Sequence, residues 1–130
     1  ELFRGVLEGV GFGVRHVLST FQELGADVRR IVAVGGGAQT DTWLQIVSDI
    51  AGVEQQVPAT TIGASYGDAF LGGLAAGVLR REQLAEWVKP GRTVQPDISR
   101  KALYDARFAD YLELYTATKG IVHRLAAAQV

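Results

Sequence analysis

Ile31-Val32-Ala33-Val34-Gly35-Gly36-Gly37-Ala38 is an apolar run that ends on three consecutive glycines. β-Branched residues dominate the positions before Gly35, which is typical of a strand buried on both faces, as in a parallel sheet. Glycine has no Cβ atom, so the backbone that follows can turn sharply and come close to a ligand. The stretch therefore predicts a buried strand that ends in a bare turn.

The residues after the glycines predict a helix that begins beside this turn. It starts near Thr40 and Asp41 and ends at about Ala51, where Gly52 interrupts the pattern. Free N–H groups and the positive end of the helix dipole would then face the turn. This arrangement suits a nucleotide, and an ordinary strand-to-helix turn is the alternative that the segment alone leaves open. The expected buried side of the helix consists of Trp43, Leu44, Ile46, Val47 and Ile50.

The composition indicates one compact domain without charge-driven partners. The 130 residues are 48% hydrophobic, carry a net charge of −1 and include no cysteine. Such a chain has no electrostatic footprint for nucleic acid, no thiolate metal site and no disulfide framework, and it fits a reducing compartment. Its most apolar window, residues 69–79, is too short to span a bilayer. We expect a cytoplasmic protein with no membrane or nucleic-acid partner and no metal-binding residues.

Hydrophobic spacing predicts further helices and a second strand. A helix over residues 2–24 has an apolar face, and Gly5, Gly9 and Gly13 form a small-residue groove suited to close packing. A strand at 53–57 meets Pro58 and is expected at a sheet edge. Helices follow at about 64–76 and 82–87, then an extended stretch at 93–96 and a long final helix. The apolar face of the first helix comprises Leu2, Val6, Val10, Val14, Val17 and Phe21.

The final helix carries an aromatic stripe at helical spacing. We expect this stripe to face the core rather than to stack on bases. Its residues are Tyr104, Phe108, Tyr111, Tyr115, Thr118, Val122 and Leu125.

The predicted fold class is α/β and helix-rich, with two parallel strands near 31–35 and 53–57. A parallel pair needs more strands and cover on both faces, so a partner sheet is missing on this count. Methionine is absent and the chain starts at Glu1, which also indicates a fragment. The open side of 31–34 predicts association, either as a homo-oligomer through the exposed sheet edge or with further polypeptide.

No residue is assigned a catalytic role. Asp49 lies in the middle of a predicted helix, where a surface or cap-supporting role is expected. Asp68 suits the N-terminal dipole of its own helix, and His16 and His123 are expected to face solvent. Residues 63–67 spell Gly-x-Ser-x-Gly, but no strand precedes them and no Asp and His partners follow, so a hydrolase is rejected.

Four segments of the chain resemble the FGGY family of carbohydrate kinases in its C-terminal domain, especially its xylulokinase-like members. The resemblance rests on the order and spacing of the segments and covers nearly the whole chain. They are Val6-Leu7-Glu8-Gly9-Val10-Gly11-Phe12, the run from Val34 to Gln45 with Ser48-Asp49 and Gly52, the run from Thr61 to Ala69, and the final Tyr/Phe-rich helix.

The resemblance implies part of an actin-like ATPase domain of ribonuclease-H-like fold, with residues 1–130 as the later part of the C-terminal domain of a sugar kinase. It implies transfer of the ATP γ-phosphoryl to a sugar hydroxyl, with xylulose or a related ketopentose as substrate and Mg²⁺ as cofactor. Gly35, Gly36, Gly37 and Ala38 would lie beneath the base and ribose, and Asp41 would make a polar contact to the nucleoside.

The resemblance places the phosphate-binding turns and the catalytic Asp in an N-terminal domain outside this chain. We therefore expect the chain alone to be inactive, because phosphoryl transfer needs a positioned triphosphate and a group that orients the nucleophile. A second hypothesis is a nucleotide-binding half-domain of a non-catalytic actin-like protein, which would use the nucleotide as a conformational switch.

Overall fold

Residues 1–128 are described by a computed structural model, and they form a helix-rich structure with one antiparallel strand pair. The helices expected at 2–24, 40–51, 64–76 and in the C-terminal part of the chain all form, with small shifts of their ends. In chain order the elements are α1 (Leu2–Glu23), η1 (Gly36–Gln39), α2 (Asp41–Ala51), β1 (Gln55–Pro58), α3 (Ala64–Ala75), η2 (Arg81–Gln83), α4 (Leu84–Trp87), β2 (Pro90–Val94), η3 (Ile98–Arg100) and α5 (Lys101–Ala127), where η marks a short 3₁₀ helix.

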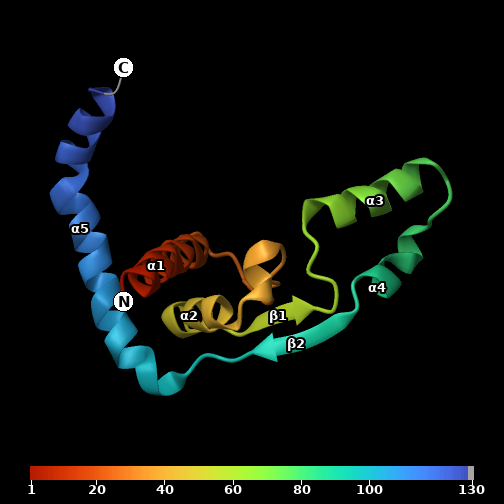
Figure 1. The fold of residues 1–130 in the computed structure, drawn as a ribbon, viewed down its shortest axis with the longest axis horizontal. Coiled ribbons are helices and arrows are strands. Elements are labelled where there is room, and N and C mark those ends of the chain that lie inside the picture. The colour runs from red at the N-terminus through yellow and green to blue at the C-terminus, as the bar shows by residue number, and fades with distance from the viewer. Residues whose placement is uncertain (129–130) are drawn as a thin grey trace.

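The elements are arranged as a packed centre with two extensions (Figure 1). Helices α1 and α2 pack on each other, and α2 also contacts α5 and β2. The β1–β2 ribbon continues from this centre toward α3 and α4, which lie at the opposite end of the molecule from α5 (Figure 1). The glycine turn and η1 therefore lie between the helical centre and the strand pair.

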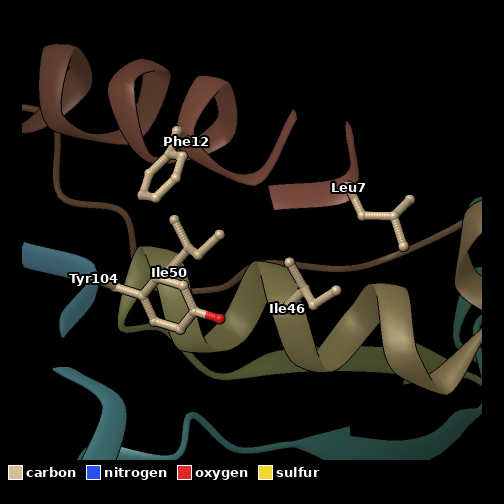
Figure 2. Close-up of a cluster of buried hydrophobic side chains, with 5 residues drawn as sticks. All are labelled: Leu7, Phe12, Ile46, Ile50 and Tyr104. Atoms are coloured by element: carbon tan, nitrogen blue, oxygen red, sulfur yellow. The ribbon is translucent and has the colours of Figure 1, made fainter. Parts of the chain in front are cut away.

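The larger core cluster joins three helices that are far apart in the sequence. Its buried members are Leu7 and Phe12 of α1, Ile46 and Ile50 of α2, and Tyr104 of α5. Figure 2 shows the Phe12 ring above Ile50, with Tyr104 approaching Ile50 from α5. The Phe12 and Tyr104 rings meet edge to face with their centroids 6.2 Å apart, a favourable geometry for aromatic pairs.

A second cluster covers the opposite side of α2. Leu44 is buried there with Ala38 of η1, Val57 of β1 and Val94 of β2. Helix α2 is therefore covered on two sides, and every residue from 46 to 50 is buried. The expected buried residues of α2 are confirmed, except that Trp43 is only half-buried.

Helix α1 buries a different face from the one that its valines predicted. Leu7, Gly11 and Phe12 are buried, whereas Val6, Val10, Val17 and Phe21 are 46–59% exposed. The physical reason is Gly11, where an added Cβ would lie 2.8 Å from Ile50 Cδ1, so the missing side chain is what admits α2. The Gly5 and Gly9 positions of the predicted groove face open space instead.

The prediction of two parallel strands is wrong. Segment 31–33 contributes only an isolated bridge, in which Val32 lies parallel to Gln56 and two backbone hydrogen bonds of 2.9 Å join the segments. The chain leaves this line at Gly35, where φ is +87°, before a longer ladder can form. The strand partner of β1 is β2, which runs antiparallel along its other side with Gln55 opposite Val94.

Consequently β1 lies between residues 31–33 and β2, and its expected position at a sheet edge is also wrong. Residues 31–34 form the open side instead, where Val32 and Val34 are 37% and 54% exposed. Self-association through this side stays a prediction, for which light scattering of the purified chain is the direct measurement.

The aromatic stripe of α5 faces the core only in its first half. Tyr104 is buried and Phe108 and Tyr111 are half-buried against Phe12, whereas Tyr115 is 62% exposed. The second half of α5 extends away from its crossing with α1, and its apolar residues, Val122 and Leu125 included, lie exposed (Figure 1). Neither α5 nor any other helix within residues 1–128 combines the length and the apolar content that crossing a membrane requires.

Asp49 is buried, so the surface role that was one of its two expected roles is wrong, whereas its contact with Asp97, the N-cap residue of η3, fits the cap-supporting role. Its Oδ1 accepts a hydrogen bond of 2.8 Å from the Asp97 N–H and one of 2.6 Å from Gln45 Nε2. Arg100 Nη1 lies 3.8 Å from Oδ2, which is otherwise without a partner in the described chain. The carboxylate therefore fastens α2 to the segment that turns from β2 into α5.

We predict that Asp49→Ala lowers the free energy of unfolding by about 1–3 kcal/mol, because it removes a buried acceptor and leaves the Asp97 N–H and Gln45 Nε2 without that partner. Urea unfolding measures this change. Asp68→Ala is the matched control, since Asp68 is exposed on α3 and its loss should change stability by less than about 0.5 kcal/mol. Equal stability of the two variants would contradict the role given to Asp49.

Candidate functional site

The glycine turn is held at both ends by backbone hydrogen bonds. Ala33 donates to the Gln56 carbonyl over 2.9 Å, and Gly35 donates to the Thr61 carbonyl over 2.7 Å. Gly35 has φ +87° and ψ −171°, a combination that residues other than glycine hardly adopt. This backbone conformation is the reason that the run 31–34 stops where it does.

After Gly35 the chain forms η1, in which one side is buried and the other is open. Ala38 is buried in the second core cluster, whereas Gly36 and Gly37 are exposed. Gly36 and Gly37 are the first residues of η1, and their N–H groups donate to no backbone carbonyl of residues 1–128. An added Cβ at Gly36 would meet no atom within 4 Å. The turn therefore presents bare backbone to the outside while Ala38 anchors it.

A hollow of about 370 Å³, here called the turn hollow, opens beside η1. Its walls come from η1, the end of β1, the loop that follows it and the start of β2. Carbon atoms of alanine, valine and proline side chains make up much of the wall. The lining residues are Ala38, Gln39, Val57, Pro58, Ala59, Thr61, Gly91 and Arg92.

Asp41 is bound to a residue that the sequence did not suggest. Its Oδ1 accepts a hydrogen bond from Arg92 Nη2, which joins the first residue of α2 to β2. The Asp41 side chain is 81% exposed and does not line the turn hollow, whereas Arg92 does. No local pattern marks Arg92, because the pairing spans 51 residues and depends on the antiparallel β1–β2 register.

The structure thus brings part of the predicted site together. Ala38 lines the turn hollow, whereas Gly35, Gly36 and Gly37 precede it in the chain and do not line the hollow. Asp41 lies at the margin, in contact with the hollow only through Arg92. Sequence reasoning missed the other lining residues, among them Thr61, Gly91 and Arg92, which come from segments distant in the sequence.

The other titratable candidates lie away from this turn. His16 is exposed on α1, where it meets the Phe108 and Tyr111 rings edge to face, and His123 is exposed on α5. Asp97 caps η3, and hydrogen bonds from the Ser99 hydroxyl and N–H lower the pKa of this carboxyl group. Among residues 1–128 no three acidic or histidine side chains gather closely enough to hold a metal ion.

Comparison with known proteins identifies the family. The sequence model of the C-terminal domain of the FGGY family of carbohydrate kinases matches residues 1–76, which include the glycine turn, η1 and α2. The chain belongs to the FGGY family of carbohydrate kinases.

Similar proteins include kinases of two pentuloses. The chain is 30% identical over 123 residues to a xylulose kinase of Bacillus subtilis, which covers 93% of this chain and 25% of that protein. It is 29% identical over 124 residues to a ribulokinase of Bacillus licheniformis, which covers 89% of this chain and 22% of the relative. The chain therefore spans about a quarter of the length of these FGGY relatives.

The fold is similar to that of solved FGGY sugar kinases. The xylulose kinase from Rhodospirillum rubrum superposes with a TM-score of 0.76 and 26% identity, over 94% of this chain and 25% of that structure. These neighbours support the expected actin-like ATPase fold, whereas the parallel strand pair within it is not supported.

We predict that Gly35→Ala destabilises the protein by about 1–3 kcal/mol, because alanine must adopt a backbone conformation essentially confined to glycine. Gly36→Ala is the matched control, since the adjacent position has ordinary φ and open space for a Cβ. Thermal unfolding of the two variants makes the comparison. A Tm for Gly35→Ala as high as that of Gly36→Ala would show that the turn does not need this conformation.

Proposed function

We propose that residues 1–130 form the later part of the C-terminal domain of an ATP-dependent sugar kinase and supply the nucleoside side of its ATP site. The observation that carries this proposal is the glycine turn, which offers exposed backbone N–H groups beside the turn hollow within the segment that matches the FGGY family. Nucleosides bind in such places because bare backbone admits a close approach and apolar walls accept a flat ring.

Within this site the residues of the chain bind and orient rather than react. The exposed backbone of Gly35 to Gly37 would contact the base and ribose beside the turn hollow, and Ala38 fixes that backbone to the core. Phosphoryl transfer depends on positioning and on stabilising charge on the transferred group. No described carboxylate lies free at the turn hollow, so the group that orients the sugar hydroxyl would come from the rest of the protein.

The proposed substrate is xylulose or a related ketopentose, because the relatives include proteins named xylulose kinase and ribulokinase. ATP is the proposed phosphoryl donor, and Mg²⁺ bound to its phosphates would neutralise part of their charge. The names of the relatives do not favour the alternative of a non-catalytic actin-like protein. A cytoplasmic location stays a prediction.

The nucleotide assignment predicts the effect of Gly36→Val in the complete kinase. The branched side chain meets no protein atom within 4 Å of its Cβ position, so it should occupy space that the ribose or base needs. We expect the KM for ATP to rise by about tenfold or more, which corresponds to a loss of roughly 1.4 kcal/mol in binding. The KM for the sugar should change little, and an unchanged KM for ATP would contradict the assignment of residues 35–38.

The domain assignment predicts that the purified 130-residue chain does not phosphorylate any ketose. Half of the proposed cleft is outside the chain, so the remaining contacts should bind ATP weakly at best. A coupled assay of ADP release with xylulose and ribulose measures the activity, and the complete kinase is the positive control. Robust turnover by the chain alone would refute the domain assignment.

A further inference from the structure

The ion pair between Asp41 and Arg92 connects the turn hollow to the start of α2. Arg92 lies opposite Val57 in the β1–β2 register, and both residues line the hollow. Asp41 does not line it, but its carboxylate accepts a hydrogen bond from the Arg92 guanidinium. The pair therefore restrains the guanidinium of a residue that lines the hollow.

The other walls of the turn hollow suit a flat, weakly polar ring. Ala38, Val57, Pro58 and Ala59 supply carbon atoms, and Gln39 and Thr61 are the uncharged polar residues of the lining. A guanidinium group is planar and stacks on aromatic faces, and it remains charged at every physiological pH. Since the hollow combines apolar walls with one fixed planar cation, a heteroaromatic base is the ligand that matches it.

The same ion pair resolves an electrostatic difficulty at this site. An unpaired Asp41 carboxylate near the turn would repel a nucleotide, whose phosphates carry the same sign of charge. Bound to Arg92, the carboxylate is part of a neutral ion pair, and Arg92 is the member of that pair that lines the hollow.

We propose that Arg92 is a nucleotide-binding residue whose guanidinium, held by Asp41, stacks on the purine base of ATP in the turn hollow. Asp41 is then a positioning residue that acts through Arg92, in place of the direct nucleoside contact expected from the sequence. This inference rests on the proposed function, since it assigns two further residues to the same nucleotide site.

The test measures nucleotide binding in the complete kinase with Arg92→Gln. We expect a rise of roughly tenfold in the KM for ATP and an equal rise in the inhibition constant of adenosine, with the KM for the sugar unchanged. Adenosine has the base and ribose of ATP but no phosphates, so its inhibition constant does not depend on a phosphate contact. A rise for ATP with no rise for adenosine would overturn the proposal in favour of a phosphate contact.

Two further variants distinguish stacking and positioning from charge alone. Arg92→Lys keeps the positive charge but removes the planar guanidinium group, so it should weaken adenosine binding nearly as much as Arg92→Gln. Asp41→Asn should raise the inhibition constant by roughly threefold, and by no further factor when Arg92 is already Gln, because the two residues would act as a unit. Full recovery by Lys, or independent effects of Asp41 and Arg92, would overturn the proposal.

Arg29→Gln is the control, because Arg29 also forms an ion pair with an aspartate, Asp27, and does not line the turn hollow. It should leave nucleotide binding unchanged, and Tm values check that every variant is folded. If Gly36→Val raises the KM for ATP but Arg92→Gln does not, this inference fails and the proposed function stands. If neither variant changes that KM, both fail.

Discussion

Helix α2 packs against α1 and α5 on one side and against η1, β1 and β2 on the other, and the rest of the described chain is arranged around it. Ile46 and Ile50 fill the first interface, and Leu44 fills the second. Full burial of each such side chain contributes about 1.5–3 kcal/mol, a large share of the net stability of a small domain. Because the two clusters share one helix, displacement of α2 would disturb the three-helix core and the strand pair together.

The glycine turn depends on that helix as well. Ala38 lies under Leu44, so η1 is fixed at its buried side, while the hydrogen bond from Gly35 to Thr61 fixes its entrance. The exposed backbone of Gly36 and Gly37 is therefore held in place by the residues on either side of it, although it makes few contacts of its own. Binding sites gain from such preorganisation, since less conformational freedom remains to be lost when a ligand arrives.

Sequence patterns predicted the features that depend on neighbours along the chain. The helices follow from 3.6-residue periodicity, the buried side of α2 from its apolar spacing, and the sharp turn from Gly35. Features set by distant partners were missed. The buried face of α1 depends on Ile50 meeting Gly11, and the burial of Asp49 depends on Asp97. The candidate site divides in the same way, since the contiguous glycines and Ala38 could be found, whereas Arg92 reaches the turn only through the pairing of β1 with β2.

The contact between α1 and α5 also has a consequence for how the chain acquires its structure. Tyr104 Oη donates to Glu8 Oε1 over 3.1 Å, which joins residues 96 positions apart, and the Tyr104 ring meets Phe12. Contacts of such long sequence separation slow folding, because the chain loses the entropy of closing the loop before the contact contributes any stabilisation. During synthesis Phe12 and Ile50 therefore lack their contact with Tyr104 until α5 has emerged from the ribosome, and over that interval their apolar surface stays partly uncovered.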